Sequence, residues 1–367
     1  MKLKKILLAI SLIVLNSTFL FAQSTPNSLL PQVDKRVELA SIAAKLADIK
    51  GFNDNANPTY SKAINKHFSP FKNHPFIQHL KELKPKLDET YWDIPAVAAH
   101  LSQPPKLEPL MAFDDVSNVD DWESRELFNA KFVKLLQQFY RDAKAEKFFK
   151  SQESYYKSVN QAYEKQGVKL NKQWINKFFG LKTTEDYFAI TALGMRSGAY
   201  MRVNFANNYR HTFTIFEMTS FDNQGIPTTF KNPYIPRMML HEYVHAFTNQ
   251  LVDKNKSTLQ SSAETILKNP KVFNLVKDTF YGNWQYLLYE SLVRSCQIKY
   301  FAANKELNLD IEKEIQAQEK AGFLWMRGLI KELDNYEANR EKHKNLGEYM
   351  PQINLFFKRV AEELKDQ

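Results

Sequence analysis

The stretch that decides both fold and chemistry covers residues 234–247 and reads Tyr-Ile-Pro-Arg-Met-Met-Leu-His-Glu-Tyr-Val-His-Ala-Phe. Pro236 suits the first turn of a helix, where its missing N–H costs no hydrogen bond. His241 and His245 are four residues apart, so on a helix both imidazoles lie on one face. Glu242 follows the first histidine directly. The segment therefore predicts a helix that carries two histidines and a carboxylate close together.

Two imidazoles one helical turn apart can hold one Zn²⁺, which needs a third protein ligand and a free position for water. The only histidine after His245 is His343, in a charged stretch, so we expect a carboxylate as the third ligand. Glu264 lies in a polar segment, whereas Glu290 lies on an apolar helical pattern. A lone carboxylate there is costly to bury unless it is paired or binds a metal. Glu290 is therefore favoured over Glu264, and an ion pair with Arg294, one turn on, is its alternative role.

The N-terminus predicts a secretory signal peptide. A basic start, Met-Lys-Leu-Lys-Lys, precedes an apolar run from Ile6 to Phe21, and a polar stretch begins at Gln23. A basic head, a short apolar middle and a small residue before the cut are typical of such leaders, so we expect cleavage after Ala22. The run is short and interrupted for a membrane span, and no later stretch approaches the ~20 residues that one needs. We expect a secreted or periplasmic protein without a stable membrane span.

Composition argues against a nucleic-acid-binding protein and against one held together by disulfides or a cysteine-rich zinc site. The formal net charge is +9, which falls to about +6 without the leader, and lysine and glutamate are spread along the chain. A solvated basic surface is therefore expected, with no nucleic acid as partner. Cys296 is the only cysteine, so neither an intrachain disulfide nor a cysteine-rich zinc site can form.

The rest of the chain is predominantly helical, with one short region of strands. Helical periodicity predicts helices over 35–50, 74–84, 93–102, 122–147, 151–167, 170–180, 236–251, 258–268, 283–304, 308–335 and 348–365. Runs rich in aromatic, threonine and isoleucine residues predict strands over 187–193, 200–205 and 212–218. We expect an α+β fold with a small sheet beside the two-histidine helix. Its regions are a signal peptide over 1–22, a helical N-terminal region over 23–182 and a catalytic region over 183–367.

The pattern resembles the gluzincin group of zinc metallopeptidases, whose HExxH motif and later glutamate match His241, Glu242, His245 and Glu290. The resemblance implies a zincin-like catalytic region, Zn²⁺ as cofactor, and hydrolysis of a peptide or protein substrate. The tract His-Glu-Tyr-Val-His-Ala-Phe, with the later Tyr-Glu-Ser-Leu-Val-Arg-Ser, is also similar to a family of secreted bacterial proteins. One position departs from the gluzincin pattern. Many gluzincins carry an aspartate four residues after the ligand glutamate, which orients a zinc-bound histidine, and here that position is Arg294. A different group must then orient the imidazoles.

In the hydrolase that this resemblance implies, Glu242 is the general base that takes a proton from water and passes it to the leaving amine. A second donor would help to stabilise the oxyanion, and the candidates are Tyr281, Tyr286 and His211. Tyr281 is preferred, because a helix break beside it would let its ring project into a cleft. The strand over 212–218 is expected to pair with an extended substrate.

Three alternatives stay open. A non-catalytic, zinc-bearing secreted binding protein would keep the metal ligands and lack turnover, so activity on a broad peptide library would separate the two functions. A hydrolase of an ester or of a cell-wall cross-link would need the same residues, since nothing in the sequence fixes the substrate. The two histidines can also be partly buried side chains that bond to backbone groups.

Overall fold

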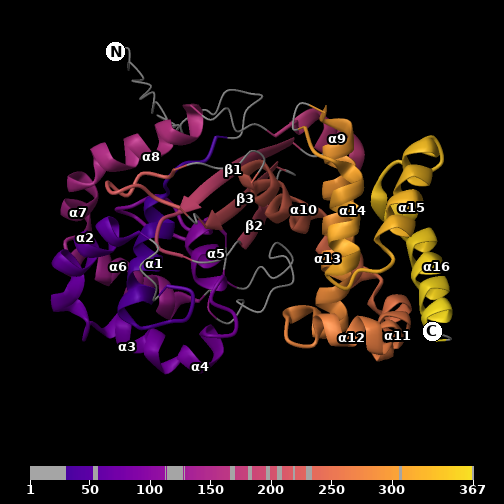
Figure 1. Cartoon of the computed structure of the whole chain (residues 1–367). Helices are drawn as coiled ribbons and strands as arrows, with labels where there is room; N and C mark the ends of the chain where they lie inside the picture. Colours follow the sequence, from indigo (N-terminus) through magenta and orange to yellow (C-terminus); the bar gives the residue numbers. More distant parts are fainter. Residues whose placement is uncertain are drawn as a thin grey trace, which may run out of the picture.

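The computed structural model describes residues 30–52, 57–111, 113, 127, 129–165, 170–180, 184–195, 199–204, 209–217, 220–228, 234–305 and 308–365. The expected signal peptide, residues 1–22, lies outside them. Among the described residues, no helix is long and apolar enough to cross a membrane. The fold is predominantly helical with one small sheet, which confirms the expected α+β class (Figure 1).

Short helices make up the first half of the chain. They are α1 (Lys35–Leu46), α2 (Pro58–Phe68), the 3-10 turn η1 (Ser69–Phe71), α3 (Pro75–Glu82), α4 (Lys84–Leu87), α5 (Asp93–Ala99), α6 (Ala130–Asp142), α7 (Ala145–Ser151), α8 (Glu153–Lys165) and α9 (Lys172–Phe179). Asp34 caps the start of α1 by accepting the backbone N–H groups of Arg36 and Val37. The Arg36 guanidinium donates to the carbonyls of Ala99 and Leu101 at the end of α5. These bonds hold α1 and α5 together.

Three strands form the sheet: β1 (Thr184–Ala192), β2 (Ala199–Asn204) and β3 (Tyr209–Glu217). Their order is β1-β3-β2, with β1 parallel and β2 antiparallel to β3. The central strand β3 therefore uses its backbone groups on both sides to bond its neighbours. The prediction that the strand over 212–218 pairs with a substrate is wrong, because both edges of that strand are already occupied.

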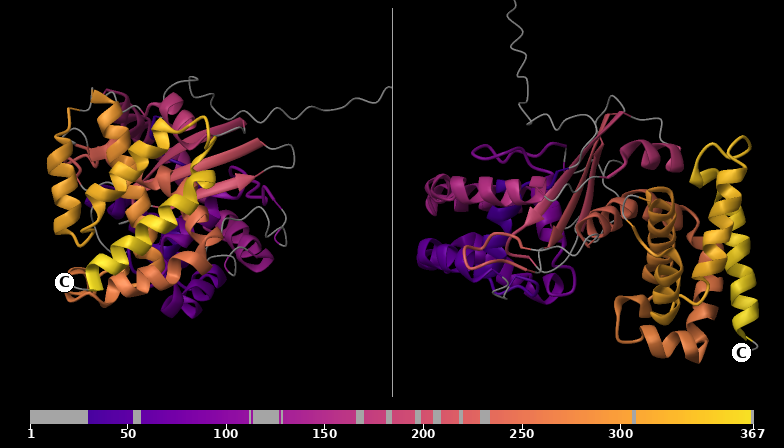
Figure 2. Two further views of the ribbon diagram at one scale, coloured as in Figure 1. Left: turned by 90° about the vertical axis from the view of Figure 1, so that its right-hand side faces the viewer. Right: turned by 45° about the horizontal axis from the view of Figure 1, so that its top comes forward.

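Helices cover the sheet on both faces. On one face, α10 (Tyr234–Lys254) packs against β3 and β2, and the Thr214 hydroxyl donates to the carbonyl of Met239. Because successive side chains of a strand point to opposite faces, Phe213 points to the other face. There the Arg36 guanidinium lies over the Phe213 ring, and α5 packs against β2 and β3. The sheet thus lies between the N-terminal helices and α10 (Figure 2).

The second half continues with helices after α10. They are α11 (Lys256–Lys268), α12 (Pro270–Val276), the 3-10 turn η3 (Phe280–Gly282), α13 (Trp284–Ala303), α14 (Ile311–Lys320), α15 (Met326–Ala338) and α16 (Leu346–Lys365). The buried helix α13, which carries the buried Cys296, packs against α10, α11, α14 and α15. One cluster of buried apolar side chains extends from α1 to α16. The expected boundary between 182 and 183 falls outside the described residues and stays a prediction.

Two predicted helices are each divided in the structure. The helix predicted over 308–335 is α14 and α15, because Gly322 between them has a φ of +106°, a conformation that favours glycine. The helix predicted over 122–147 is α6 and α7, separated where Lys144 has a φ of +50°. Residues 122–126 and 128 of that prediction lie outside the described residues. In both cases a single left-handed residue ends the helix, although the apolar pattern continues.

Among the helices that were not predicted, α2 and α12 both begin at an Asn-Pro pair. Asn57 accepts the backbone N–H of Tyr60, and Asn269 accepts those of Lys271 and Val272. In each case the proline follows the asparagine cap in the first turn. An Asn-Pro pair is typical of a turn, but an asparagine cap followed by proline also begins helices.

Candidate metal centre

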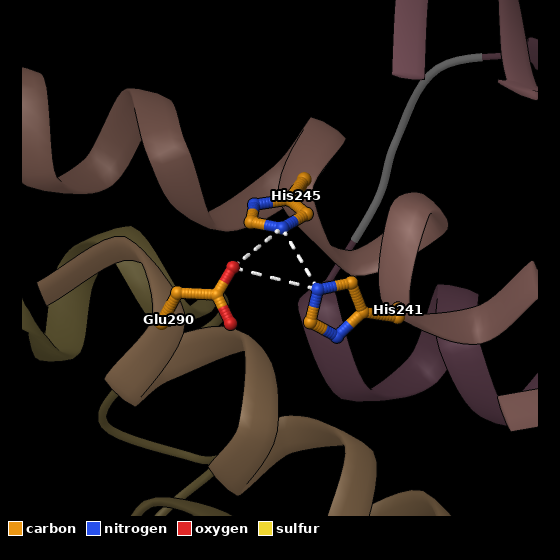
Figure 3. Close-up of side chains that lie close together, drawn as sticks. All are labelled: His241, His245 and Glu290. Carbon is orange, nitrogen blue, oxygen red and sulfur yellow. Dashed lines mark hydrogen bonds and ion pairs between the residues drawn. The ribbon is translucent and has the colours of Figure 1, made fainter. Parts of the chain in front are cut away.

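Two neighbouring helices bring three potential metal ligands together. His241 and His245 project from α10, and Glu290 projects from α13 toward them (Figure 3). The two histidine Nε2 atoms are 3.2 Å apart. Glu290 Oε1 lies 3.4 Å from His241 Nε2 and 3.2 Å from His245 Nε2. These three atoms form a nearly equilateral triangle, and the three residues form a group that can hold a metal ion.

The size of this triangle fits a tetrahedral transition-metal site. With metal–ligand bonds of about 2.0–2.1 Å, as for zinc, neighbouring ligand atoms of a tetrahedron lie about 3.3–3.4 Å apart. Calcium bonds are longer, about 2.3–2.6 Å, and both Ca²⁺ and Mg²⁺ prefer oxygen ligands. Two imidazole nitrogens and one carboxylate oxygen therefore suit zinc better than either. The three side chains are 19%, 12% and 10% exposed, so solvent reaches the group.

Of the two candidate glutamates, the structure brings only Glu290 to the histidines. Glu264 is exposed on α11, and its carboxylate accepts a hydrogen bond from Gln260. Glu290 also forms the ion pair with Arg294 that the sequence suggested as an alternative role, with Arg294 Nε 2.7 Å from Glu290 Oε2. The two roles are compatible because they use different carboxylate oxygens.

Electrostatics favour an ionised Glu290. Burial by itself acts to raise the pKa of this carboxyl, but the imidazoles of His241 and His245 oppose burial more strongly and hold the pKa well below its usual range. A carboxylate that stays negative is the form that binds a cation. The same carboxylate raises the pKa of His245, against the effect of its burial, so a metal ion competes with a proton at that imidazole.

Asn249 orients one of the two imidazoles. Its Oδ1 atom is 3.0 Å from Nδ1 of His245, so the Nδ1–H group donates to the amide oxygen. That bond leaves the lone pair of Nε2 directed at the other two ligand atoms, as is usual for metal-binding histidines. Asn249 was not among the predicted site residues, although its place one turn after His245 on the same helix was a usable signal.

Glu242 is buried beside the ligands without being one of them. Burial raises the pKa of its carboxyl, the charges of His241 and His245 act in the opposite direction, and the charge of Glu290 adds to the rise. A carboxyl whose affinity for protons is increased is better suited to accept and return one near neutral pH.

The three side chains predicted as candidate hydrogen-bond donors to the oxyanion, Tyr281, Tyr286 and His211, lie in different places. The Tyr281 hydroxyl is 2.8 Å from an Nη atom of Arg294, so one side chain separates it from Glu290. Tyr286 packs against the rings of Phe280 and Tyr289. His211 is an even number of residues from Phe213, so it shares the face of the sheet that is turned away from α10. Of the contacts given above, the one that Tyr281 makes with Arg294 leads to the ligand cluster.

Comparison with known proteins identifies the family. The family described as a domain of unknown function, DUF4932, matches residues 29–355. The matched region includes the N-terminal helices, the sheet and all three ligand residues. No curated protein and no solved structure matches the chain. Because the match covers most of its length, the chain belongs to the DUF4932 family.

Proposed function

We propose that this protein is an exported zinc-dependent hydrolase that cleaves peptide bonds. The observation that carries the proposal is the triangle of His241, His245 and Glu290 ligand atoms, with sides of 3.2–3.4 Å and with the carboxyl of Glu242 beside it. The expected signal peptide supports export to a secreted or periplasmic location. The resemblance to gluzincins supports a zincin-like catalytic region and a peptide or protein substrate.

The residues divide the chemistry among them. Zn²⁺ supplies a Lewis acid that activates water and polarises a carbonyl group. Glu242 accepts a proton from the attacking water and later returns it to the leaving amine. Asn249 keeps His245 in the orientation that exposes Nε2. Tyr281 donates its hydroxyl hydrogen to the developing oxyanion, a contribution that grows as negative charge builds up.

The sheet offers one edge for an extended substrate near the ligand helix. β2 packs beside α10, and its outer edge pairs with no strand among the described residues. An extended peptide that adds to this edge would bond through its main chain, the usual mode of strand addition. β2 therefore replaces the strand over 212–218 as the proposed substrate strand.

The first test is metal content. Residues 23–367 are purified and loaded with equimolar Zn²⁺, Fe²⁺ or Co²⁺, and bound metal is measured by mass spectrometry. We expect one equivalent of zinc in the wild type and none in His245→Ala. Preferential retention of iron would contradict the proposal, because two histidines and one carboxylate also form iron sites of a different chemistry. A wild type that retains no metal would refute it outright.

The second test separates catalysis from metal binding. Glu242→Gln should keep one equivalent of zinc and lower kcat on a cleaved library peptide by at least ~10²-fold, the usual contribution of a general base. Glu264→Gln is the matched control, since that carboxylate is exposed outside the cluster, and it should leave kcat unchanged. Zinc binding without cleavage of any library peptide would instead support the non-catalytic binding protein. Equal turnover of Glu242→Gln and wild type would remove Glu242 as the base.

A further inference from the structure

Arg294 uses all three of its guanidinium nitrogens on three different elements. Nε donates to Glu290 Oε2 at 2.7 Å on its own helix, α13. Nη1 donates to Gln318 Oε1 of α14 at 2.6 Å, and Nη2 donates to the Tyr281 hydroxyl of η3 at 2.8 Å. The guanidinium also lies 4.8 Å from the ring centroid of Phe323. These contacts fix the guanidinium on several sides, and its side chain is only 18% exposed.

We propose that Arg294 is a positioning residue that leaves one oxygen of Glu290 for the metal and holds the Tyr281 hydroxyl one side chain away from the ligand cluster. This inference rests on the proposed metal site and deepens it. It assigns a role to the position at which the sequence departs from the gluzincin aspartate. Arginine is positively charged where the gluzincin residue is a negatively charged aspartate, so residue 294 bonds the carboxylate ligand Glu290 and not a histidine. Asn249 orients a histidine instead.

The two oxygens of Glu290 are divided between two partners. Oε1 faces both imidazoles at 3.2 and 3.4 Å, whereas Oε2 is engaged by Arg294. A carboxylate without such a partner can bind a metal through both oxygens and so fill an additional coordination position. A charge-assisted bond to Oε2 opposes that mode. The position that water or substrate needs therefore stays open.

Arg294 also fixes the direction of the Tyr281 hydroxyl. The tyrosine oxygen accepts an N–H from the guanidinium, so its own hydrogen points away from Arg294 and is available to a substrate. Tyr281 lies on η3, which has only three residues, Phe280–Gly282, and this bond adds an anchor for its hydroxyl group. Lysine cannot reproduce the arrangement, because its ammonium is a point charge without the planar fork of arginine.

The experiment compares Arg294→Met and Arg294→Lys with wild type in the full mature protein. Zn²⁺ affinity is measured by competition with a chromophoric chelator, and Co²⁺-loaded protein is examined by visible absorption, which reports coordination number. We expect Arg294→Met to bind Zn²⁺ about 10–100-fold more weakly, because the Glu290 carboxylate loses the partner that orients it. The variant should also show a weaker Co²⁺ band, because Glu290 is then free to bind through both oxygens. Arg294→Lys should recover part of the affinity and remain low in kcat, because Tyr281 is no longer held.

Arg327→Met is the matched control, since Arg327 pairs with Glu312 at an exposed site, with both side chains 53% exposed. It should leave Zn²⁺ affinity, the Co²⁺ spectrum and kcat unchanged. Arg294→Met with wild-type affinity and spectrum would overturn the inference while the zinc site itself stands. A wild type that binds no metal would instead remove the proposed function and this inference together. If Arg294→Met does not fold, Arg294→Lys decides, and wild-type values of both spectrum and kcat in that variant would overturn the inference.

Discussion

Replacing Glu38 by glutamine should make the stability of the protein less sensitive to pH. Glu38 lies on α1 with 1% of its surface exposed, and its Oε1 atom accepts the backbone N–H of Leu193, just after β1, at 2.9 Å. Burial raises the pKa of this carboxyl to about 7 from the 4.5 of an unperturbed glutamate. The bond from Leu193 and the Tyr60 hydroxyl act to lower the pKa, and the charge of Asp34 adds slightly to the rise.

The direction of this pH dependence follows from the number of protons that the folded and unfolded states bind. Because the folded pKa is raised, the native state keeps its proton up to about pH 7, whereas the unfolded chain loses it near pH 4.5. The free energy of unfolding therefore falls as the pH rises through this window. At about 1.4 kcal/mol per pKa unit, the full effect is roughly 3 kcal/mol, of which about 2.5 kcal/mol falls between pH 5 and pH 8.

Urea unfolding followed by tryptophan fluorescence at pH 5 and pH 8 measures this difference. Glutamine keeps the acceptor for Leu193 and cannot ionise, so Glu38→Gln should lose about 2.5 kcal/mol less than wild type between the two pH values. Groups common to both proteins cancel in the comparison. Glu264→Gln, at an exposed position, should follow wild type. Parallel pH dependence of Glu38→Gln and wild type would refute a buried, proton-holding Glu38.

Two further predictions concern single positions. Asn249→Ala should weaken Zn²⁺ binding by about 10–100-fold, because His245 loses the acceptor that orients it. Asn249→Asp, which keeps an acceptor, should bind at least as tightly as wild type, and equal Zn²⁺ affinity of all three in chelator competition would contradict this role. Gly322→Ala should lower the free energy of unfolding by about 1–3 kcal/mol, because its Cβ would lie 2.7 Å from Val276 Cγ1 at a φ of +106°. The control Gly194→Ala, whose Cβ would meet no described atom within 4 Å, should unfold in urea like wild type, and equal stability of the two variants would rule out the strain at Gly322.

The parts of the site that depend on local sequence could be predicted. The spacing of His241 and His245 follows from the period of one helix. Glu290 was favoured because an isolated carboxylate on an apolar helix needs a partner, and the structure supplies both the imidazoles and Arg294. The Gln318 contact to Arg294 could not be predicted, because it depends on how α14 packs against α13. Sequence periodicity does not contain that information.

The divided helices and the wrongly assigned substrate strand have two different physical sources. Single residues with positive φ, Lys144 and Gly322, end helices inside segments whose apolar pattern continues. Strand order was the other source, because a strand's position in a sheet depends on its pairing partners. Nothing in the residues of β3 distinguishes a central strand from an edge strand, so the substrate strand was assigned wrongly. The helix that carries His241 and His245 was predicted because its signals are all local.

The arrangement of the sheet between α10 and the helices α1 and α5 has a consequence for dissecting this protein. A fragment that starts at residue 183 would retain the three candidate metal ligands but would expose Phe213 and Ile215, both 0% exposed in the whole chain, to water. Such a fragment carries the chemistry without the surface that keeps its strands soluble, and we expect it to aggregate. Supplying residues 23–182 as a separate peptide should rescue it, so the two halves behave as complementary parts of one folding unit.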